Sequence, residues 1–299
     1  MWIELSLTSR YPEFAEEVLL AHGAVSVDLS DAADEPLLEP PPGATPLWQH
    51  TTTRGLFHPE TDFEKVRAAL RELLPDGAAL QVEQRTVKDE DWINAWLQHA
   101  KPLRFGAAGK PGLWICPSGH QVDEQDATVV RLDPGLAFGT GTHPSTALCL
   151  QWLAVHDVAG RSVLDFGCGS GILAIAALKR GAAQALAVDI DPQALVATRG
   201  NAQLNAVDQW IRCADAAQFA EQAVDDSVDI VLANILARPL IELAPTLSRC
   251  VRPGGSIVLA GVLQTQADEV RAAYAPWFDF DDDGLREDWA CLSGTRRRL

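Results

Sequence analysis

The stretch Ser162-Val163-Leu164-Asp165-Phe166-Gly167-Cys168-Gly169-Ser170-Gly171-Ile172-Leu173 decides the fold of this 299-residue chain. Its first five residues are mostly apolar and suit a buried strand, the three glycines suit a tight loop, and the apolar residues from Ile172 onward begin a helix. Glycine lets the backbone approach a ligand closely, and the helix N-terminus adds free N–H donors and a partial positive charge. The stretch therefore predicts a ligand-binding loop at the carboxyl edge of a parallel sheet.

The spacing of the glycines separates two kinds of ligand. Counted from Gly167, the dinucleotide fingerprint GxGxxG needs its third glycine at position 172, where this chain has Ile172. The observed pattern is DxGxGxG, and Asp165 on the entry side of the loop is placed to meet an ammonium group, which a methionine moiety has and a pyrophosphate lacks. We therefore expect Asp165, Gly167, Gly169 and Gly171 to bind the cofactor. An NAD-dependent dehydrogenase is the alternative that this spacing disfavours.

Two acidic residues follow the next predicted strands. Asp189 ends one strand, twenty-two residues after Gly167, where a carboxylate accepts hydrogen bonds from the hydroxyls of a ribose. Asp215 follows the third strand, where it would accept a hydrogen bond from the exocyclic amine of an adenine. Either acid alone would be interpreted as a solvated strand end. Together, in register with the glycine loop, they favour a cofactor that carries a nucleoside.

From Ser145 onward, short apolar strands alternate with helices, which is typical of a doubly wound parallel sheet. The predicted strands are residues 162–166, 185–189, 210–213, 228–233 and 256–260, and the predicted helices are residues 171–180, 192–205 and 239–250. Residues 252–255, Arg-Pro-Gly-Gly, are expected to close the last helix. Residues 278–280 and 289–294 are expected to pair as a terminal hairpin.

The first 86 residues follow a different pattern. Strands are predicted at residues 2–7, 25–29, 48–57 and 80–85, and helices at residues 12–22 and 61–74, the first closed by Gly23 and the second capped by Thr61 or Asp62. This order matches the split βαβ, or ferredoxin-like, sandwich. The whole chain is thus predicted to be α/β, with a smaller N-terminal α+β domain.

The predicted boundaries are a domain at residues 1–86, a connecting region at 87–132 and a larger domain at 133–299. Trp92, Trp96 and Trp114 in the connecting region indicate either packing between the domains or ordinary core aromatics. The formal charge of −17 disfavours nucleic acid, whose binders need a basic patch, and suits a basic partner. The alternative is that the acidity only keeps the protein in solution.

Neither a membrane span nor an export signal is expected. The apolar stretches are shorter than the roughly 20 residues of a spanning helix, and Met1-Trp2-Ile3-Glu4-Leu5 lacks the basic and apolar regions of a signal peptide. The six cysteines include no CxxC pair, which disfavours both a zinc site and a disulfide framework. We therefore expect a cytoplasmic protein with reduced thiols and no metal.

Three blocks of sequence carry a resemblance to a known family. From residue 145 onward the chain resembles the class I, S-adenosylmethionine-dependent methyltransferases. A narrower resemblance lies in Leu132-Asp133-Pro134-Gly135-Leu136-Ala137-Phe138-Gly139-Thr140-Gly141-Thr142-His143-Pro144-Ser145-Thr146, in residues 165–171, and in Asn234-Ile235-Leu236. These blocks, their order and the small N-terminal domain resemble the ribosomal-protein methyltransferase family PrmA over the whole chain, more weakly before residue 90.

The resemblance implies a cofactor, a substrate and part of the site. S-adenosyl-L-methionine is the implied cofactor, and Thr146, Gly167, Asp189 and Asn234 match positions that contact it in the family. The implied substrate is the stalk-base protein of the large ribosomal subunit, methylated on lysine ε-amines and on its N-terminal α-amine. The N-terminal domain is implied to recognise this basic protein, which is consistent with the acidic charge of the chain.

The loop before residue 146 is too polar and too rich in glycine for a core element. We expect it to fold over a bound cofactor, so that Phe138 and Gly139 contact it; a surface turn is the alternative. Thr146 opens the following helix, where its hydroxyl and the helix amides would engage the carboxylate of the methionine moiety. A plain capping role is the alternative for Thr146.

Asn234 and His143 are the candidate catalytic residues. Asn234 lies beyond a strand end, where its side-chain carbonyl would orient the attacking amine; capping the next helix is the alternative. The expected reaction is a direct in-line displacement aided by alignment. A lysine amine has a pKa of about 10.4 and must lose a proton to react. His143 is the candidate acceptor, with water as the alternative, and a structural role for His143 stays open.

The residues after Asn234 separate substrate classes. Methyltransferases that act on planar amide or nucleobase nitrogens resemble one another in an Asn-Pro-Pro-aromatic sequence, which is replaced here by Asn234-Ile235-Leu236. We therefore expect an aliphatic amine substrate and no direct nucleic-acid recognition. The alternatives are a methyltransferase for another protein, RNA or a small molecule, and a non-catalytic ribosome-binding module. A monomer is expected, and residues 279–283 either form a solvated acidic loop or contact the substrate.

Overall fold

The computed structural model describes residues 2–33, 48, 50–74, 81–87, 101–117, 119–132, 141–222 and 225–298. The predicted roles of Phe138, Gly139, Trp92 and Trp96 lie outside these residues. The chain folds as two compact units, residues 1–95 and residues 96–299. In the part of the chain that is described, no helix combines the length and the apolar character needed to cross a membrane.

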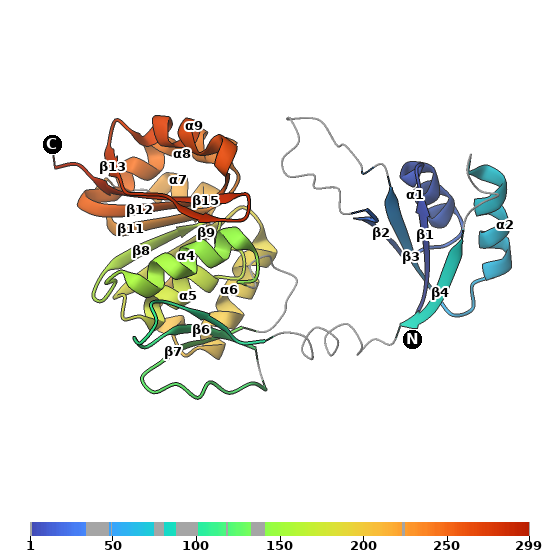
Figure 1. Ribbon diagram of the computed structural model, residues 1–299, viewed down its shortest axis with the longest axis horizontal. Helices are drawn as coiled ribbons and strands as arrows, with labels where there is room; N and C mark the ends of the chain where they lie inside the picture. The colour runs from blue at the N-terminus through green and yellow to red at the C-terminus, as the bar shows by residue number, and fades with distance from the viewer. Residues whose placement is uncertain are drawn as a thin grey trace. The chain divides into compact units, whose positions relative to one another are not determined.

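The N-terminal unit is a four-stranded antiparallel sheet with two helices on one face (Figure 1). Its elements are β1 (Trp2–Ser9), α1 (Pro12–Ala21), β2 (Ser26–Asp31), β3 (Thr51–Phe57), α2 (Phe63–Leu73) and β4 (Val82–Val87). The strands are ordered β2-β3-β1-β4. This is the arrangement of a ferredoxin-like sandwich, so the predicted fold of this region is confirmed.

Alternation along β1 gives this sheet two different faces. Leu5 and Leu7 are buried in the core that the sheet shares with α1 and α2, whereas Ser6 and Thr8 project from the opposite face. The helix α2 begins where predicted, because the Asp62 side chain accepts a hydrogen bond from the Lys65 backbone N–H. The face without helices is therefore polar and open.

The second unit is built on an eight-stranded sheet with the order β10-β9-β8-β11-β12-β15-β13, and β14 pairs with β15. Its strands are β8 (Ser162–Phe166), β9 (Gln184–Asp189), β10 (Ile211–Asp215), β11 (Val228–Asn234), β12 (Val251–Leu263), β13 (Phe278–Phe280), β14 (Gly284–Arg286) and β15 (Trp289–Arg296). The strands β8 to β12 are parallel, and β15 runs antiparallel to its neighbours. The strand order reverses between β8 and β11, and ligands bind at this point in open α/β sheets.

Helices cover both faces of this sheet (Figure 1). One face carries α4 (Pro144–Val155), α5 (Ile172–Lys179) and α6 (Pro192–Leu204), and the other carries α7 (Ala216–Gln222), α8 (Ala237–Cys250) and α9 (Ala267–Tyr274). Among the described residues, the two larger apolar cores lie one on each face, with Leu150 and Ile175 in the first and Leu240 and Val270 in the second. The predicted doubly wound α/β architecture is confirmed.

A small three-stranded sheet precedes α4 and packs on the first core through Phe105, Leu113 and Ile115. It consists of β5 (Leu103–Phe105), β6 (Leu113–Cys116) and β7 (Thr128–Arg131), in that order. Glu124 joins its strands, because its carboxylate accepts hydrogen bonds from the Arg104 side chain, Trp114 Nε1 and the Gly112 backbone. The sequence left two roles open for Trp114. In the structure its side chain stabilises this small sheet through the hydrogen bond to Glu124.

Some predicted boundaries were wrong, and some elements were missed. Residues 252–255 do not close a helix, because α8 ends at Cys250 and β12 begins at Val251. A Cβ at Gly255 would lie 2.5 Å from the Asp229 backbone oxygen, so close strand packing explains this glycine. The short elements α7, α9 and β5 to β7 were missed, since few residues give weak periodicity. The predicted pairing of residues 278–280 with 289–294 is confirmed, with Phe280 opposite Gly294, although β14 lies between these strands in the chain and forms the hairpin with β15.

Candidate functional site

The glycine loop leaves the buried strand β8 and is shaped by left-handed glycines. Gly167, Gly169 and Gly171 have φ values of +77°, +53° and +77°, which residues with a side chain rarely adopt. The backbone N–H groups of Gly167 and Cys168 both donate to the Val188 carbonyl of β9, at 2.8 and 3.0 Å. The loop is therefore folded back against the neighbouring strand before α5 begins.

The helix α6 holds the loop from its other side. Thr198 Oγ1 donates to the Gly169 carbonyl at 3.0 Å, and Asn201 Nδ2 donates to the Ser170 carbonyl at 2.9 Å. A Cβ at Gly171 would lie 2.7 Å from Thr198 Cγ2, so this glycine is required by close approach as well as by its φ. Thr198 and Asn201 were not predicted from the sequence. Their spacing of three places them on one helix face, but nothing in the sequence shows that this face meets the loop.

A cavity of about 510 Å³ opens beside the loop at the carboxyl ends of the strands. Its walls are mostly apolar, and its polar groups come from the loop backbone, Asp189, Thr146 and Asn234. Ile190 and Leu236 lie at its wall although 83% and 51% exposed. The described residues that line it are Thr146, Phe166, Gly167, Cys168, Gly169, Ile172, Leu173, Val188, Asp189, Ile190, Ala216, Asn234, Ile235, Leu236, Pro239 and Leu243.

Asp189 belongs both to the cavity wall and to the scaffold of the loop. Its Oδ2 accepts a hydrogen bond from the Gly169 N–H at 2.8 Å, and its Oδ1 accepts one from the Asp191 N–H at 3.0 Å. Each carboxylate oxygen has a second lone pair for a ligand hydroxyl. The geometry thus keeps Asp189 in a position to bind a ribose while it fixes the loop.

Asp165 lies beneath the loop and is not among the described residues that line the cavity. It is 1% exposed, and its Oδ2 accepts a hydrogen bond from the Ala174 N–H at 3.0 Å, which anchors the first turn of α5. Burial raises the pKa of this carboxyl from 3.8 to about 7, and the charge of Asp189 adds to the increase. Its predicted contact with an ammonium group stays a prediction.

Asp215 ends β10 and is partly buried. Its Oδ1 accepts a hydrogen bond from the Gln218 N–H at 2.8 Å, so it caps the first turn of α7. The next residue, Ala216, lines the cavity, whereas Asp215 itself is not among the described lining residues. The predicted bond to an adenine amine stays a prediction for Asp215.

Thr146 and Asn234, 88 residues apart in sequence, meet at the cavity. Asn234 Nδ2 donates to Thr146 Oγ1 at 3.0 Å, and Thr146 is 1% exposed. This bond ties the first turn of α4 to the carboxyl end of β11. It also fixes the orientation of the Asn234 amide, with Oδ1 directed away from Thr146.

His143, rather than Thr146, is the N-cap of α4. His143 Nδ1 accepts a hydrogen bond from the Ser145 N–H at 3.3 Å and lies 2.8 Å from Ser145 Oγ. Its ring packs edge-on against Trp289 of β15, with ring centroids 4.7 Å apart. Partial burial lowers the pKa of His143, and the charge of Glu287 opposes this effect. The imidazole is therefore mostly neutral at pH 7, as a proton acceptor must be.

These features fit S-adenosyl-L-methionine. The cavity supplies glycine amides for close approach, apolar walls for an adenine and for the methylene groups of the methionine chain, and a carboxylate at Asp189 for ribose hydroxyls. In that arrangement Asp189 would hold the ribose, and the loop, Thr146 and Asn234 would surround the methionine end. A doubly wound sheet with this loop at its reversal point defines a class I, S-adenosylmethionine-dependent methyltransferase.

The particular family follows from comparison with known proteins. Residues 1–297 match the family model described as ribosomal protein L11 methyltransferase (PrmA). The chain is 49% identical to the ribosomal protein L11 methyltransferase of Methylococcus capsulatus, over 99% of this chain and 100% of that protein. It is 46% identical to that of Aeromonas salmonicida, over 99% of both chains. The chain therefore belongs to the PrmA family and is a methyltransferase that uses S-adenosyl-L-methionine.

A solved structure agrees with this membership. The ribosomal protein L11 methylase of Lactobacillus delbrueckii subsp. bulgaricus is 34% identical to this chain, with a TM-score of 0.56. The match covers 62% of this chain and 95% of that one. The predicted family resemblance, the enzyme class and the cofactor are confirmed. The individual site residues stay predictions.

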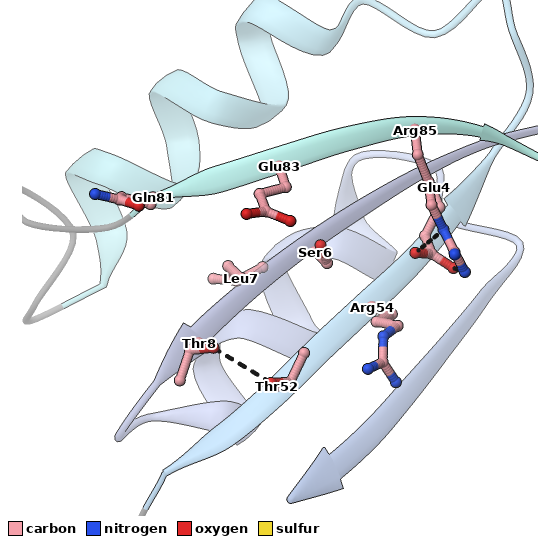
Figure 2. Close-up of a pocket in the computed structure, with 9 residues that line it drawn as sticks. All are labelled: Glu4, Ser6, Leu7, Thr8, Thr52, Arg54, Gln81, Glu83 and Arg85. Carbon is pink, nitrogen blue, oxygen red and sulfur yellow. Dashed lines mark hydrogen bonds and ion pairs between the residues drawn. The ribbon is translucent and has the colours of Figure 1, made fainter. Parts of the chain in front are cut away.

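A second hollow, of about 630 Å³, lies on the open sheet face of the N-terminal unit. Figure 2 shows its residues along β1, β3 and β4, with the guanidinium groups of Arg54 and Arg85 at one end and Thr8 bonded to Thr52 at the other. Arg85 pairs with Glu4 at 2.6 Å, and Arg54 Nη1 donates to Ser30 at 2.9 Å. The hollow is polar and carries both signs of charge.

Proposed function

We propose that this protein transfers methyl groups from S-adenosyl-L-methionine to amino groups of ribosomal protein L11, namely lysine ε-amines and the N-terminal α-amine. The observation that carries the proposal is the Thr146–Asn234 pair at the cofactor cavity. Because Asn234 Nδ2 is bonded to Thr146, its Oδ1 is the atom that can accept a hydrogen bond from an incoming amine. The relatives are named ribosomal protein L11 methyltransferase, which supports L11 as the protein that carries this amine.

The surroundings of Asn234 suit an aliphatic amine. The cavity wall continues with Ile235 and Leu236 in place of the Pro-Pro-aromatic clamp that planar nitrogens need. A lysine side chain brings an apolar stem and one nitrogen, so an apolar wall and one directed acceptor are sufficient. The methyl donor supplies an electrophilic carbon, and the protein contributes alignment.

The amine must be neutral to attack, and His143 is the proposed acceptor of its proton. Partial burial lowers the pKa of the imidazole, so that it is mostly neutral at pH 7. Because Nδ1 accepts the Ser145 N–H bond, the neutral ring carries its proton on Nε2. Nδ1, which also lies 2.8 Å from Ser145 Oγ, is therefore the atom that would take the proton of the amine. His143 caps the helix that carries Thr146, three residues away, and is itself not among the described residues that line the cavity. Water is the alternative acceptor.

The N-terminal unit, predicted as residues 1–86, is the proposed recognition domain for ribosomal protein L11. Its hollow face presents hydroxyls and both charge signs, which suits hydrogen bonding to a folded protein surface (Figure 2). Glu83→Lys should raise the KM for the basic ribosomal protein while cofactor affinity stays constant, because it replaces an attractive charge of the hollow with a repulsive one. Glu72→Lys on α2, on the opposite side of the sheet, is the matched control. Equal KM values for the two variants would refute this role.

We further propose that the protein acts in the cytoplasm, as a monomer, without direct contact to nucleic acid. The charge of −17 supports the last point, because it repels a phosphate backbone and attracts a basic ribosomal protein.

Mass spectrometry of a reconstituted reaction tests the substrate assignment. Purified full-length protein, S-adenosyl-L-methionine and unmodified ribosomal protein L11 should give a series of L11 species, each heavier by one methyl group. Peptide mapping should place these methyl groups on lysines and the N-terminus. The control replaces L11 with another basic ribosomal protein, which should not change in mass. Bound cofactor together with unchanged L11 would refute the substrate and leave the cofactor assignment intact.

A further inference from the structure

Ile235 follows Asn234 and is enclosed by two glycines from different parts of the chain. A Cβ at Gly167, in the cofactor loop, would lie 2.2 Å from Ile235 Cγ2. A Cβ at Gly261 would lie 2.4 Å from the Ile235 carbonyl oxygen and 2.8 Å from its carbonyl carbon. Neither position can therefore carry a side chain unless Ile235 moves.

Gly261 reaches Ile235 because β12 is irregular at this point. The pairing of β12 with β15 shifts register between Leu259 and Val262, and Gly261 lies inside this irregularity with a φ of +78°. On the other side of β12, Ala260 is the partner of Asn234 in β11. Glycine is the residue that combines this φ with close backbone approach. The irregularity thus places the Cα of Gly261, which has no side chain, against the residue that follows β11.

We propose that Gly261 is a positioning residue for methyl transfer, which acts through Ile235 to hold Asn234 against Thr146. Gly261 is not among the described residues that line the cofactor cavity, so it does not act by touching the ligand. Its effect passes through the Ile235 backbone to the adjacent Asn234, whose Nδ2 lies 3.0 Å from Thr146 Oγ1. Gly167 contacts the side chain of Ile235, whereas Gly261 contacts its backbone.

The size of the expected effect follows from the distances. A Cβ of Gly261→Ala would start 2.4 Å from a backbone oxygen, whereas ordinary contacts begin at 3.4 Å. The backbone at Ile235 must therefore move by about 1 Å, and a misplacement of about this size lowers the rate of an aligned reaction by about 100-fold. We expect kcat to fall by about this factor in Gly261→Ala.

A second glycine of the chain provides a matched control. Gly160, between α4 and β8, has a φ of +69°, and a Cβ there would meet nothing within 4 Å. Gly160→Ala therefore imposes a similar backbone strain without displacing a neighbour. With ribosomal protein L11 as acceptor, Gly261→Ala should lose about 100-fold in kcat with KM unchanged, and Gly160→Ala should keep the wild-type kcat. Equal kcat values for the two variants, both folded by circular dichroism, would overturn the proposal.

Two further measurements decide the matter if Gly261→Ala fails to fold or L11 is not the acceptor. Gly167→Ala pushes the side chain of Ile235, and adding Ile235→Ala removes the methyl group that it meets. The Asn234 side-chain amide resonances report its bond to Thr146 by NMR without any substrate. They should shift in Gly167→Ala and return toward wild type in the double variant, while Gly160→Ala leaves them unchanged. Resonances that stay in place in Gly167→Ala would overturn the proposal, whatever the substrate is.

Discussion

Replacing Asp165 with asparagine is expected to change how the free energy of unfolding depends on pH. The Asp165 carboxyl is buried beneath the glycine loop, and burial raises its pKa from 3.8 to about 7. Between these values the folded protein keeps a proton that the unfolded chain has released. The stabilisation by the protonated group is therefore complete below pH 3.8 and is lost as the pH rises to about 7.

The size of this loss follows from the shift. A change of about three pKa units, at about 1.36 kcal/mol per unit, corresponds to about 4 kcal/mol of unfolding free energy as an upper value. Asparagine does not titrate and can still accept the Ala174 N–H bond through its oxygen. The difference in unfolding free energy between Asp165→Asn and wild type should thus shift in favour of the variant as the pH rises.

Urea unfolding followed by circular dichroism, from about pH 4 to about pH 8, measures this difference. Subtracting the unfolding free energy of the wild type from that of the variant removes the contribution of the other acidic groups to the pH dependence. Asp208→Asn, at an exposed position of the same unit, is the matched control. A flat difference for Asp165→Asn would mean that Asp165 is ionised throughout the range, and would refute the argument from burial.

Substitutions at three other residues test the site and its support. His143→Ala should lower kcat by about 100-fold without weakening cofactor binding, whereas His143→Asn keeps an N-cap but not a base; normal turnover in His143→Asn would assign His143 to capping alone. Thr146→Val should lower kcat through the lost bond to Asn234, and Thr146→Ser should restore it; equal rates would exclude the bond from catalysis. Asp229→Ala should cost about 3 kcal/mol in urea unfolding, because it leaves the Ser162 N–H unpaired inside the sheet. A loss below about 1 kcal/mol would show that water replaces this carboxylate.

The sequence predicted those parts of the site that depend on local pattern. The loop from Asp165 to Gly171 and the strand end at Asp189 were found because strand, glycine spacing and helix start are contiguous. The same holds for the ferredoxin-like unit, whose alternation and helix periodicity are short-range signals. These features can be predicted without knowing which residues pack against them in the folded protein.

The contacts that complete the site are long-range, and single-sequence patterns do not contain them. The Thr146–Asn234 bond spans 88 residues, and the enclosure of Ile235 by Gly261 depends on a register shift in β12. The capping role of His143 was also missed, because histidine is not a favoured N-cap and Thr146 is. The burial of Asp165 depends on residues that pack against β8 from other parts of the chain. Its carboxylate was therefore predicted to contact a ligand, whereas in the structure it accepts a hydrogen bond from the Ala174 N–H.

The hydrogen bonds around the glycine loop have a consequence for the thermodynamics of ligand association. The Val188 carbonyl, Asp189, Thr198 and Asn201 hold the loop in its glycine-specific shape through contacts internal to the protein. Cofactor association therefore orders little backbone in the glycine loop, and the entropic penalty from this loop is small. Calorimetry of S-adenosylhomocysteine binding should accordingly give a heat-capacity change that matches burial of the apolar cavity wall, with no additional part from folding of the loop.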